Sequence, residues 1–127
     1  MVKTIEHVGI YAVDSKLLAE WYVDVLGFEI VVAKNGNYFI KANDNSMLEI
    51  CVAKENLGRF GDKASGIRHI ALEVEDFECA VEKLLSARVE IVIEPKISDT
   101  GVKTFFFEDP EGNVLHLINR PNPLIKV

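Results

Sequence analysis

The sequence has few of the features that mark secreted, membrane or disulfide-rich proteins. It has two cysteines, Cys51 and Cys79, which are too few for a disulfide framework and lack the spacing of a metal-binding motif. No apolar run approaches the roughly 20 residues that a membrane-spanning helix needs, and the first residues lack the apolar core of a signal peptide. These absences predict a reduced, cytoplasmic setting and no membrane partner.

An excess of basic residues is also absent. Lysine and arginine number 14 against 20 aspartates and glutamates, which gives a net charge of −6. Nucleic acids and anionic membranes attract basic surfaces, so we expect neither as a partner. The chain of 127 residues has the length of one domain. We therefore expect a single domain over residues 1–127, large enough to bury a core.

Histidine is scarce, and all three histidines fall at matching positions of an internal repeat. Residues 4–14 (TIEHVGIYAVD) are echoed by residues 66–76 (GIRHIALEVED), so His69 follows its counterpart His7 by 62 residues. A second match near the end of each half pairs Glu49, in MLEIC, with His116, in VLHLI.

Each copy of the repeat thus supplies two side chains of the metal-ligand type. Imidazole nitrogens and carboxylate oxygens suit divalent ions such as Zn, Ni, Co, Mn or Fe, and do not choose among them. Four such groups at repeat-matched positions predict a metal site. The alternative is that each residue is an ordinary strand histidine or glutamate without a ligand role, since an antiparallel sheet can have one solvent-exposed face.

Both halves show the same order of predicted elements, strand–helix–strand–strand–strand. Asp14 and Asp76 are expected N-caps, and Gly27 is an expected helix C-terminus. In repeat 1–53 we expect strands at 3–12, 28–34, 37–43 and 46–53. In repeat 66–120 we expect strands at 66–75, 89–94, 102–108 and 113–119, with a linker at 54–65.

Neither sheet can cover its own faces with a single helix, so the two repeats are expected to pack together with the helices outside. Side chains alternate along a strand, which puts His7 in phase with Gly9 and Tyr11, and Glu49 in phase with Cys51. The fold class is therefore α+β, with ligand-type residues on one face of each sheet.

Four segments resemble the vicinal-oxygen-chelate superfamily, which includes glyoxalase I, methylmalonyl-CoA epimerase, extradiol dioxygenases and the fosfomycin and bleomycin resistance proteins. The segments that carry the resemblance are residues 5–10 (IEHVGI), 21–28 (WYVDVLGF), 67–74 (IRHIALEV) and 109–117 (DPEGNVLHL). The resemblance covers nearly the whole chain. It implies one glyoxalase-like domain whose two βαβββ repeats form paired half-barrel sheets around a central concave site.

The resemblance also implies a ligand set. Glyoxalase I-like members hold a divalent metal with a His, a Glu, a His and a Glu, one from each of four strands. His7, Glu49 and His69 match the first three, and His116 stands where the last Glu usually stands. That last carboxylate is linked to proton transfer in such enzymes. Glu49, the only carboxylate in the matched set, is thus the expected catalytic base, with Glu73 a weaker candidate.

Three functions fit these residues. The first is a metal-dependent lyase or isomerase of the glyoxalase I or epimerase type, acting on a small 2-oxo or thioester compound. The second is a metal-free protein that binds a small molecule, such as a drug. The third is an Fe(II) extradiol-type dioxygenase. We expect a homodimer, because uncovered edge strands favour association and dimers are the commonest oligomers.

Several other polar residues have ordinary structural interpretations. Residues 109–113 predict a turn rather than a catalytic loop. Cys51 shares a face with Glu49 and is expected to be a small buried hydrophobic residue. Lys41, Lys103 and Arg120 are available as contacts for an anion, although solvated charges are the default expectation for all three.

Overall fold

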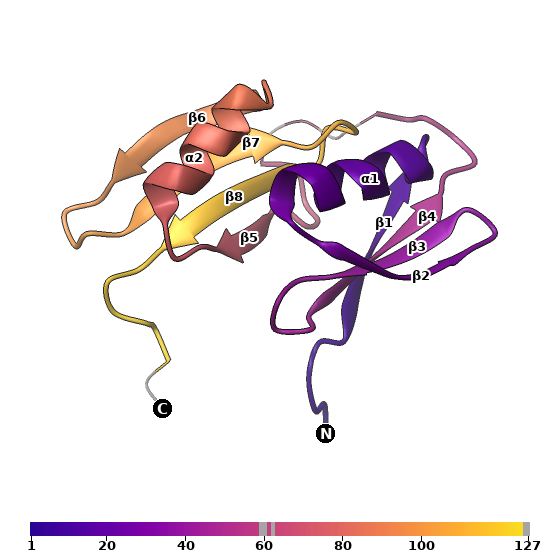
Figure 1. Ribbon diagram of the computed structural model, residues 1–127, viewed down its shortest axis with the longest axis horizontal. Helices are drawn as coiled ribbons and strands as arrows, with labels where there is room; N and C mark the ends of the chain where they lie inside the picture. The colour runs from indigo at the N-terminus through magenta and orange to yellow at the C-terminus, as the bar shows by residue number, and fades with distance from the viewer. Residues whose placement is uncertain (59–60, 62, 126–127) are drawn as a thin grey trace. The chain divides into compact units, whose positions relative to one another are not determined.

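A computed structural model describes residues 1–58, 61 and 63–125, and the chain forms two compact units, residues 1–58 and 59–127 (Figure 1). Each unit contains one helix and one mixed four-stranded sheet in βαβββ order, which confirms the predicted α+β class and the two repeats. Residues 59, 60 and 62 of the predicted linker lie outside the described residues.

In the first unit the helix lies on one face of the sheet and packs its buried residues against the strands. The elements are β1 (His7–Ala12), α1 (Ser15–Leu26), β2 (Glu29–Lys34), β3 (Asn37–Lys41) and β4 (Met47–Val52). The sheet order is β1-β4-β3-β2, with β1 parallel to β4 and the other pairs antiparallel. Alternate strand residues, among them Ile10, Ile40 and Ile50, are buried with Leu18 and Tyr22 of α1. The intervening residues occupy the other face.

The ends of α1 are set by the two residues that the sequence predicts. The Asp14 carboxylate accepts a hydrogen bond from the Leu17 amide at 3.0 Å, which satisfies one of the free N–H groups of the first turn. Gly27 has φ of 76°, a left-handed conformation that costs glycine little, and its amide bonds the Val23 carbonyl at 3.2 Å. The helix therefore begins and ends as predicted.

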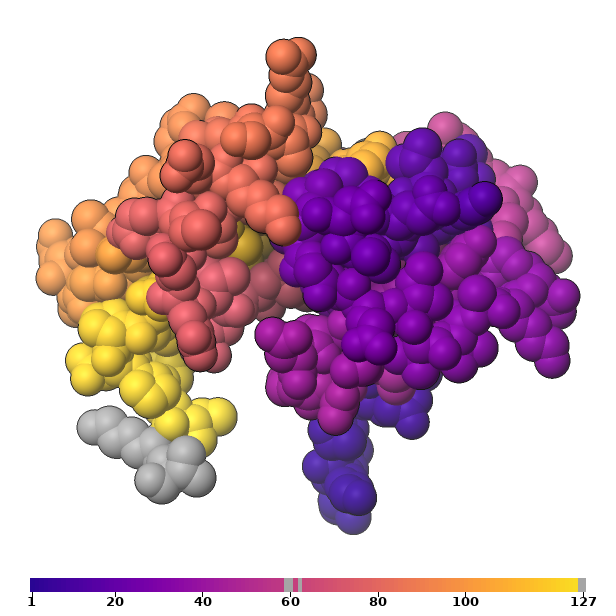
Figure 2. Space-filling model, in the orientation of Figure 1, coloured from indigo at the N-terminus to yellow at the C-terminus, as the bar shows by residue number. Residues whose placement is uncertain are grey.

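The second unit repeats this plan with a shorter helix. Its elements are β5 (Ile70–Glu73), α2 (Phe77–Ser86), β6 (Glu90–Ile97), β7 (Lys103–Glu108) and β8 (Val114–Asn119). The sheet order is β5-β8-β7-β6, with β5 parallel to β8. The core holds Phe77, Leu84, Phe105, Phe107 and Leu115. Each helix is visible at the surface of its own unit in Figure 2, so one side of each is solvated. Neither described helix is long and apolar enough to cross a membrane.

Three strand boundaries differ from the predictions by three residues or more, and the pairing partners explain these differences. β1 begins at His7 rather than at residue 3 because its partner β4 begins opposite it, at Met47. β5 starts at Ile70 rather than at residue 66 because Leu115, near the start of β8, is its first partner. β6 extends to Ile97 because β7 pairs with it to that point, and Pro95 is tolerated since β6 is an edge strand.

Candidate metal centre

In the first unit, the pairing of β1 with β4 brings together the two predicted ligands. Gly9 lies opposite Glu49, and His7 is two residues earlier on the same face of β1. The His7 Nε2 atom lies 3.7 Å from Glu49 Oε1. A Cβ built on Gly9 would meet no described atom within 4 Å, so the space beside Glu49 is open.

The other ring nitrogen of His7 has a different partner. His7 Nδ1 lies 2.9 Å from Oε1 of the preceding residue, Glu6. The ring also packs edge-on against Phe39 of β3, with 5.2 Å between ring centroids. His7 is thus held on two sides, by a carboxylate and by an aromatic ring, while its Nε2 faces Glu49.

In the second unit, the two predicted ligands are a pair of imidazoles. The ring centroids of His69 and His116 lie 4.4 Å apart, with the rings inclined at 60°. Phe106 of β7 covers the His116 ring at 4.3 Å between centroids and meets His69 edge-on at 5.4 Å. The Nδ1 atoms of both histidines are buried and have no hydrogen-bond partner among the described residues. An unpartnered buried nitrogen is costly unless something binds it.

The electrostatics of this pair favour neutral rings. Burial is the largest cause, and together with the nearby His69, Arg68 and Arg120 it lowers the pKa of His116 to about 4. Burial, followed by the charge of Arg68, also lowers the pKa of His69. Both rings are therefore unprotonated at neutral pH, which is the form that binds metal ions.

The two aromatic neighbours belong to the repeat, although the sequence analysis did not identify them. Phe39 pairs with Glu49 across β3 and β4, and Phe106 pairs with His116 across β7 and β8. Each phenylalanine precedes its partner by ten residues (49 − 39 and 116 − 106). This equal spacing is the sequence signal by which the two phenylalanines could have been identified. Each predicted ligand pair thus has a phenylalanine beside it on the same face of its sheet.

The other polar candidates have mostly structural partners. Lys41 lies 3.6 Å from Glu29, and Lys103 lies 2.5 Å from Glu78, so both lysines form ion pairs. Glu73 is exposed and pairs with Ile118, two residues beyond His116 along β8. Cys51 is half-buried rather than fully buried, and burial, together with the Glu49 charge, raises the pKa of its thiol.

The turn at residues 109–113 is structural, as predicted. The buried Asp109 carboxylate accepts hydrogen bonds from the backbone amides of Glu111 and Asn113, at 2.9 and 3.0 Å, and from the Asn113 side chain at 2.8 Å. These three bonds fix the connection between β7 and β8, and with it the start of the strand that carries His116.

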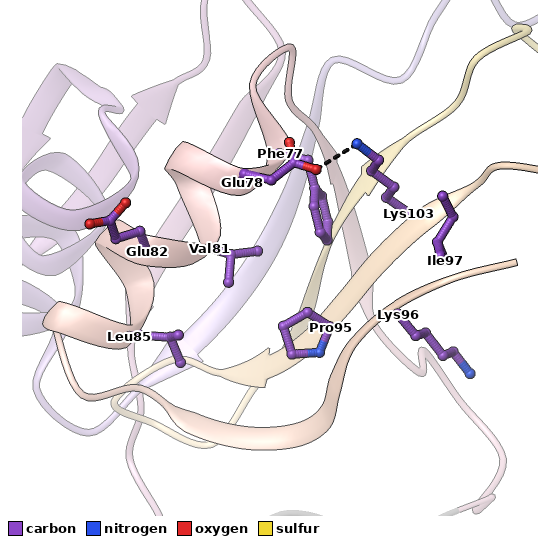
Figure 3. A pocket seen from close by; sticks show the side chains of 9 residues that line it. All are labelled: Phe77, Glu78, Val81, Glu82, Leu85, Pro95, Lys96, Ile97 and Lys103. Atoms are coloured by element: carbon purple, nitrogen blue, oxygen red, sulfur yellow. Dashed lines mark hydrogen bonds and ion pairs between the residues drawn. The ribbon is translucent and has the colours of Figure 1, made fainter.

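A separate groove of about 490 Å³ lies between α2 and the β6–β7 strands (Figure 3). Its walls are mainly apolar, from Phe77, Val81 and Leu85 on α2 and from Pro95 and Ile97 on β6. The Glu78–Lys103 ion pair joins helix and strand across it. None of the four predicted ligands lines the groove. It is therefore distinct from the candidate metal centre.

The donor set in each unit fits a divalent metal ion. Two ligand atoms at about 2.0–2.2 Å from one ion can be no more than about 4.4 Å apart. The 3.7 Å between His7 Nε2 and Glu49 Oε1 is within that limit. In the second unit, the Nδ1 atoms of His69 and His116 are buried and have no hydrogen-bond partner among the described residues. The described residues contain no group of three or more ligand-type side chains that could hold an ion.

The sequence matches the Glyoxalase/Bleomycin resistance protein/Dioxygenase superfamily over residues 4–117. The chain belongs to this superfamily. It is 29% identical to the uncharacterized protein YaeR of Escherichia coli (strain K12), over 91% of this chain and 95% of that protein. It is 28% identical to a probable lactoylglutathione lyase of Synechocystis, over 88% of this chain and 92% of the relative.

A solved structure has the same fold. The glyoxalase family protein from Enterococcus faecalis superposes with a TM-score of 0.77 at 30% identity, over 92% of this chain and 98% of that one. Glyoxalase-superfamily membership and the α+β fold thus agree with the resemblance drawn from the sequence.

Proposed function

We propose that this member of the glyoxalase superfamily is a metal-dependent lyase or isomerase of the glyoxalase I or epimerase type. Its substrate would be a small 2-oxo or thioester compound, and its reaction a proton transfer beside the carbonyl group. The observation that carries the proposal is the His7–Glu49 pair, in which the only carboxylate of the ligand set lies 3.7 Å from an imidazole nitrogen. A probable lactoylglutathione lyase among the relatives supports it.

His7, Glu49, His69 and His116 would together hold one divalent ion, which superfamily members usually use. Zn, Ni, Co, Mn and Fe all suit this mixture of nitrogen and oxygen donors. A bound divalent metal supplies Lewis-acid stabilisation of negative charge on oxygen. Three neutral imidazoles and one carboxylate would leave a net charge of about +1 at the centre, which favours an anionic ligand.

Glu49 is proposed as the catalytic base. Its side chain is 27% exposed, so it can be reached by a substrate, and the space over Gly9 gives room for one. The carboxylate would take the proton from the carbon next to the carbonyl. In an isomerisation it would return the proton to the neighbouring carbon, and in an epimerisation to the opposite face of the same carbon. Phe39, which pairs with Glu49 across β3 and β4, would limit the access of water to this proton.

Isotope exchange tests the reaction type. The metal-loaded protein is incubated in deuterated water with 2-oxo hemithioacetals and racemic acyl-CoA thioesters, and the metal content is measured anaerobically. Metal-dependent deuterium uptake beside the carbonyl, with no oxygen consumed, is expected. Oxygen consumption with a catechol and bound Fe(II), without exchange, would establish the dioxygenase alternative. Ligand binding without any metal would establish the metal-free binding protein.

We also propose that residues 1–127 form one domain, and that the protein is a cytoplasmic homodimer. Superfamily proteins commonly bind small molecules and form dimers, and Cys51 and Cys79 are free thiols. Sedimentation at micromolar concentration, combined with metal analysis, tests the assembly. A monomer with full metal content would exclude the dimer and would place the ligand set within one chain.

A further inference from the structure

Glu6, which immediately precedes the predicted ligand His7, contacts the ring nitrogen that faces away from Glu49. Glu6 Oε1 lies 2.9 Å from His7 Nδ1, within hydrogen-bonding distance. An ionised carboxylate can only accept hydrogen bonds. The proton of the neutral His7 ring therefore lies on Nδ1, which donates to Glu6.

This hydrogen bond determines what the opposite nitrogen can do. A neutral imidazole carries one proton, so a proton on Nδ1 leaves Nε2 with a free lone pair. Nε2 is the atom that lies 3.7 Å from Glu49 Oε1. In the other tautomer, Nε2 would hold the proton and could not bind a metal ion without losing it.

The second unit lacks this arrangement. The residue that matches Glu6 in the repeat is Arg68, a cation that cannot accept a hydrogen bond. Its guanidinium lies over the Phe106 ring, 5.1 Å from the centroid. The Nδ1 atom of the following residue, His69, has no hydrogen-bond partner among the described residues. The carboxylate–imidazole contact is thus specific to the first unit.

We propose that Glu6 is a positioning residue that fixes the tautomer and the ring orientation of His7, and so presents Nε2 to the metal. The inference rests on the proposed metal-dependent function. Carboxylates that accept from the second nitrogen of a metal-binding histidine raise its basicity and hold its ring, and their loss typically costs 10–100-fold in metal affinity. The Glu6 side chain is 72% exposed, so we expect the lower end of that range.

Metal affinity provides the first test, by competition with a chromophoric chelator for Zn²⁺ and Co²⁺. Glu6→Ala should weaken binding about 10-fold, whereas Glu6→Gln, which retains an acceptor oxygen, should stay within about threefold of wild type. The matched control is Glu20→Ala, which removes another exposed carboxylate, 4.0 Å from Lys16 on α1. The proposal would be overturned if Glu6→Ala bound metal as tightly as wild type. It would also be overturned if Glu6→Ala, Glu6→Gln and Glu20→Ala all lost the same metal affinity.

The tautomer of His7 provides a second readout that needs no metal. Nitrogen-15 chemical shifts of the metal-free protein are recorded at pH 8, where a histidine side chain is ordinarily neutral. We expect Nδ1–H in wild type and in Glu6→Gln, and a shift toward Nε2–H in Glu6→Ala. An Nε2–H tautomer in wild type would overturn the inference. Failure of wild type to bind any metal would instead refute the proposed function, while the tautomer measurement would still decide the role of Glu6.

Discussion

The two units place their predicted ligands at matching positions of the repeat, with His7 opening β1 and His69 directly preceding β5, but the chemistry of the two pairs differs. In the first unit, His7 and Glu49 are partly exposed, and Glu6 accepts from the second nitrogen of His7. In the second, His69 and His116 have buried Nδ1 atoms without partners. One scaffold therefore provides a half with a carboxylate and a half with two imidazoles, and the proposed proton-transfer role would fall to the first unit.

The helices differ in a similar way. The 12-residue α1 packs against all four strands of its sheet, whereas the 10-residue α2 packs chiefly on β8. Because α2 is shorter and packs chiefly on β8, a groove remains beside β6 in the second unit. The two units therefore share the βαβββ order and the positions of the predicted ligands, whereas their outer surfaces differ.

The largest expected effect comes from removing the base that only the first unit has. Glu49→Gln should lower the deuterium-exchange rate by about 10²–10⁴-fold, the usual contribution of a general base. Rates with the 2-oxo and thioester compounds at saturating metal measure this loss. Glu73→Gln on β5 is the control, because it removes an exposed carboxylate from the other unit. A larger loss in Glu73→Gln would transfer the base role to the second unit.

Acid should destabilise the metal-free protein through the second unit. The pKa of His116 is about 4 in the folded protein and about 6.5 in the unfolded chain, so between these values the unfolded chain binds more protons. Stability is therefore retained above pH 6.5 and falls as the pH drops toward 4. The loss amounts to about 3 kcal/mol, measured by urea denaturation in the presence of a chelator.

The matched variant for this titration is His116→Gln, which removes the titrating group and keeps a polar side chain. Its unfolding free energy should fall less between pH 6.5 and pH 4 than that of wild type. An identical slope in His116→Gln and wild type would show that another group causes the acid sensitivity.

Giving the second unit a carboxylate would make the two ligand pairs alike. His116→Glu should preserve metal binding, because carboxylates bind the same ions, while shifting preference toward Mn²⁺ over Zn²⁺ by about tenfold. Competition between the two ions, followed by metal analysis, measures this change. His116→Leu, which supplies no ligand, is the control and should lose affinity for both ions. An unchanged preference in His116→Glu would exclude position 116 from the ligand set.

The smallest expected difference lies in the helix caps. Asp14→Ala and Asp76→Ala each remove a carboxylate that accepts an amide hydrogen bond at 3.0 Å, at a cost of about 1 kcal/mol. The first turn of α2 also contains Glu78, whereas that of α1 has no acidic residue. Asp14→Ala should therefore cost a few tenths of a kcal/mol more, as measured by chemical denaturation. Equal losses of unfolding free energy in the two variants would show that Glu78 does not compensate for the missing Asp76 carboxylate.

The sequence predicted those features that depend on nearby residues. Asp14, Gly27 and Asp76 act within one turn of their own helices, so their types alone indicated the helix ends. The start of β1 depends instead on where β4 begins, and β4 lies some forty residues later in the chain. The contact of Glu6 with His7 depends on side-chain rotamers, which no periodicity reports. The repeat predicted candidate ligand positions, but not which nitrogen of each ring has a hydrogen-bond partner.

The edge strands of the two sheets have a consequence for behaviour at high protein concentration. An edge strand with free amides can recruit a strand from another molecule, and proline and lysine oppose such aggregation. In β6, Pro95 lacks a backbone N–H and Lys96 adds a charge near the end of the strand. In β2, Ile30, Val31 and Val32 are each at least 40% exposed, and the register shift at Val31 is the main irregularity of the edge. The β2 edge of the first unit therefore has fewer features that oppose strand addition than the β6 edge of the second.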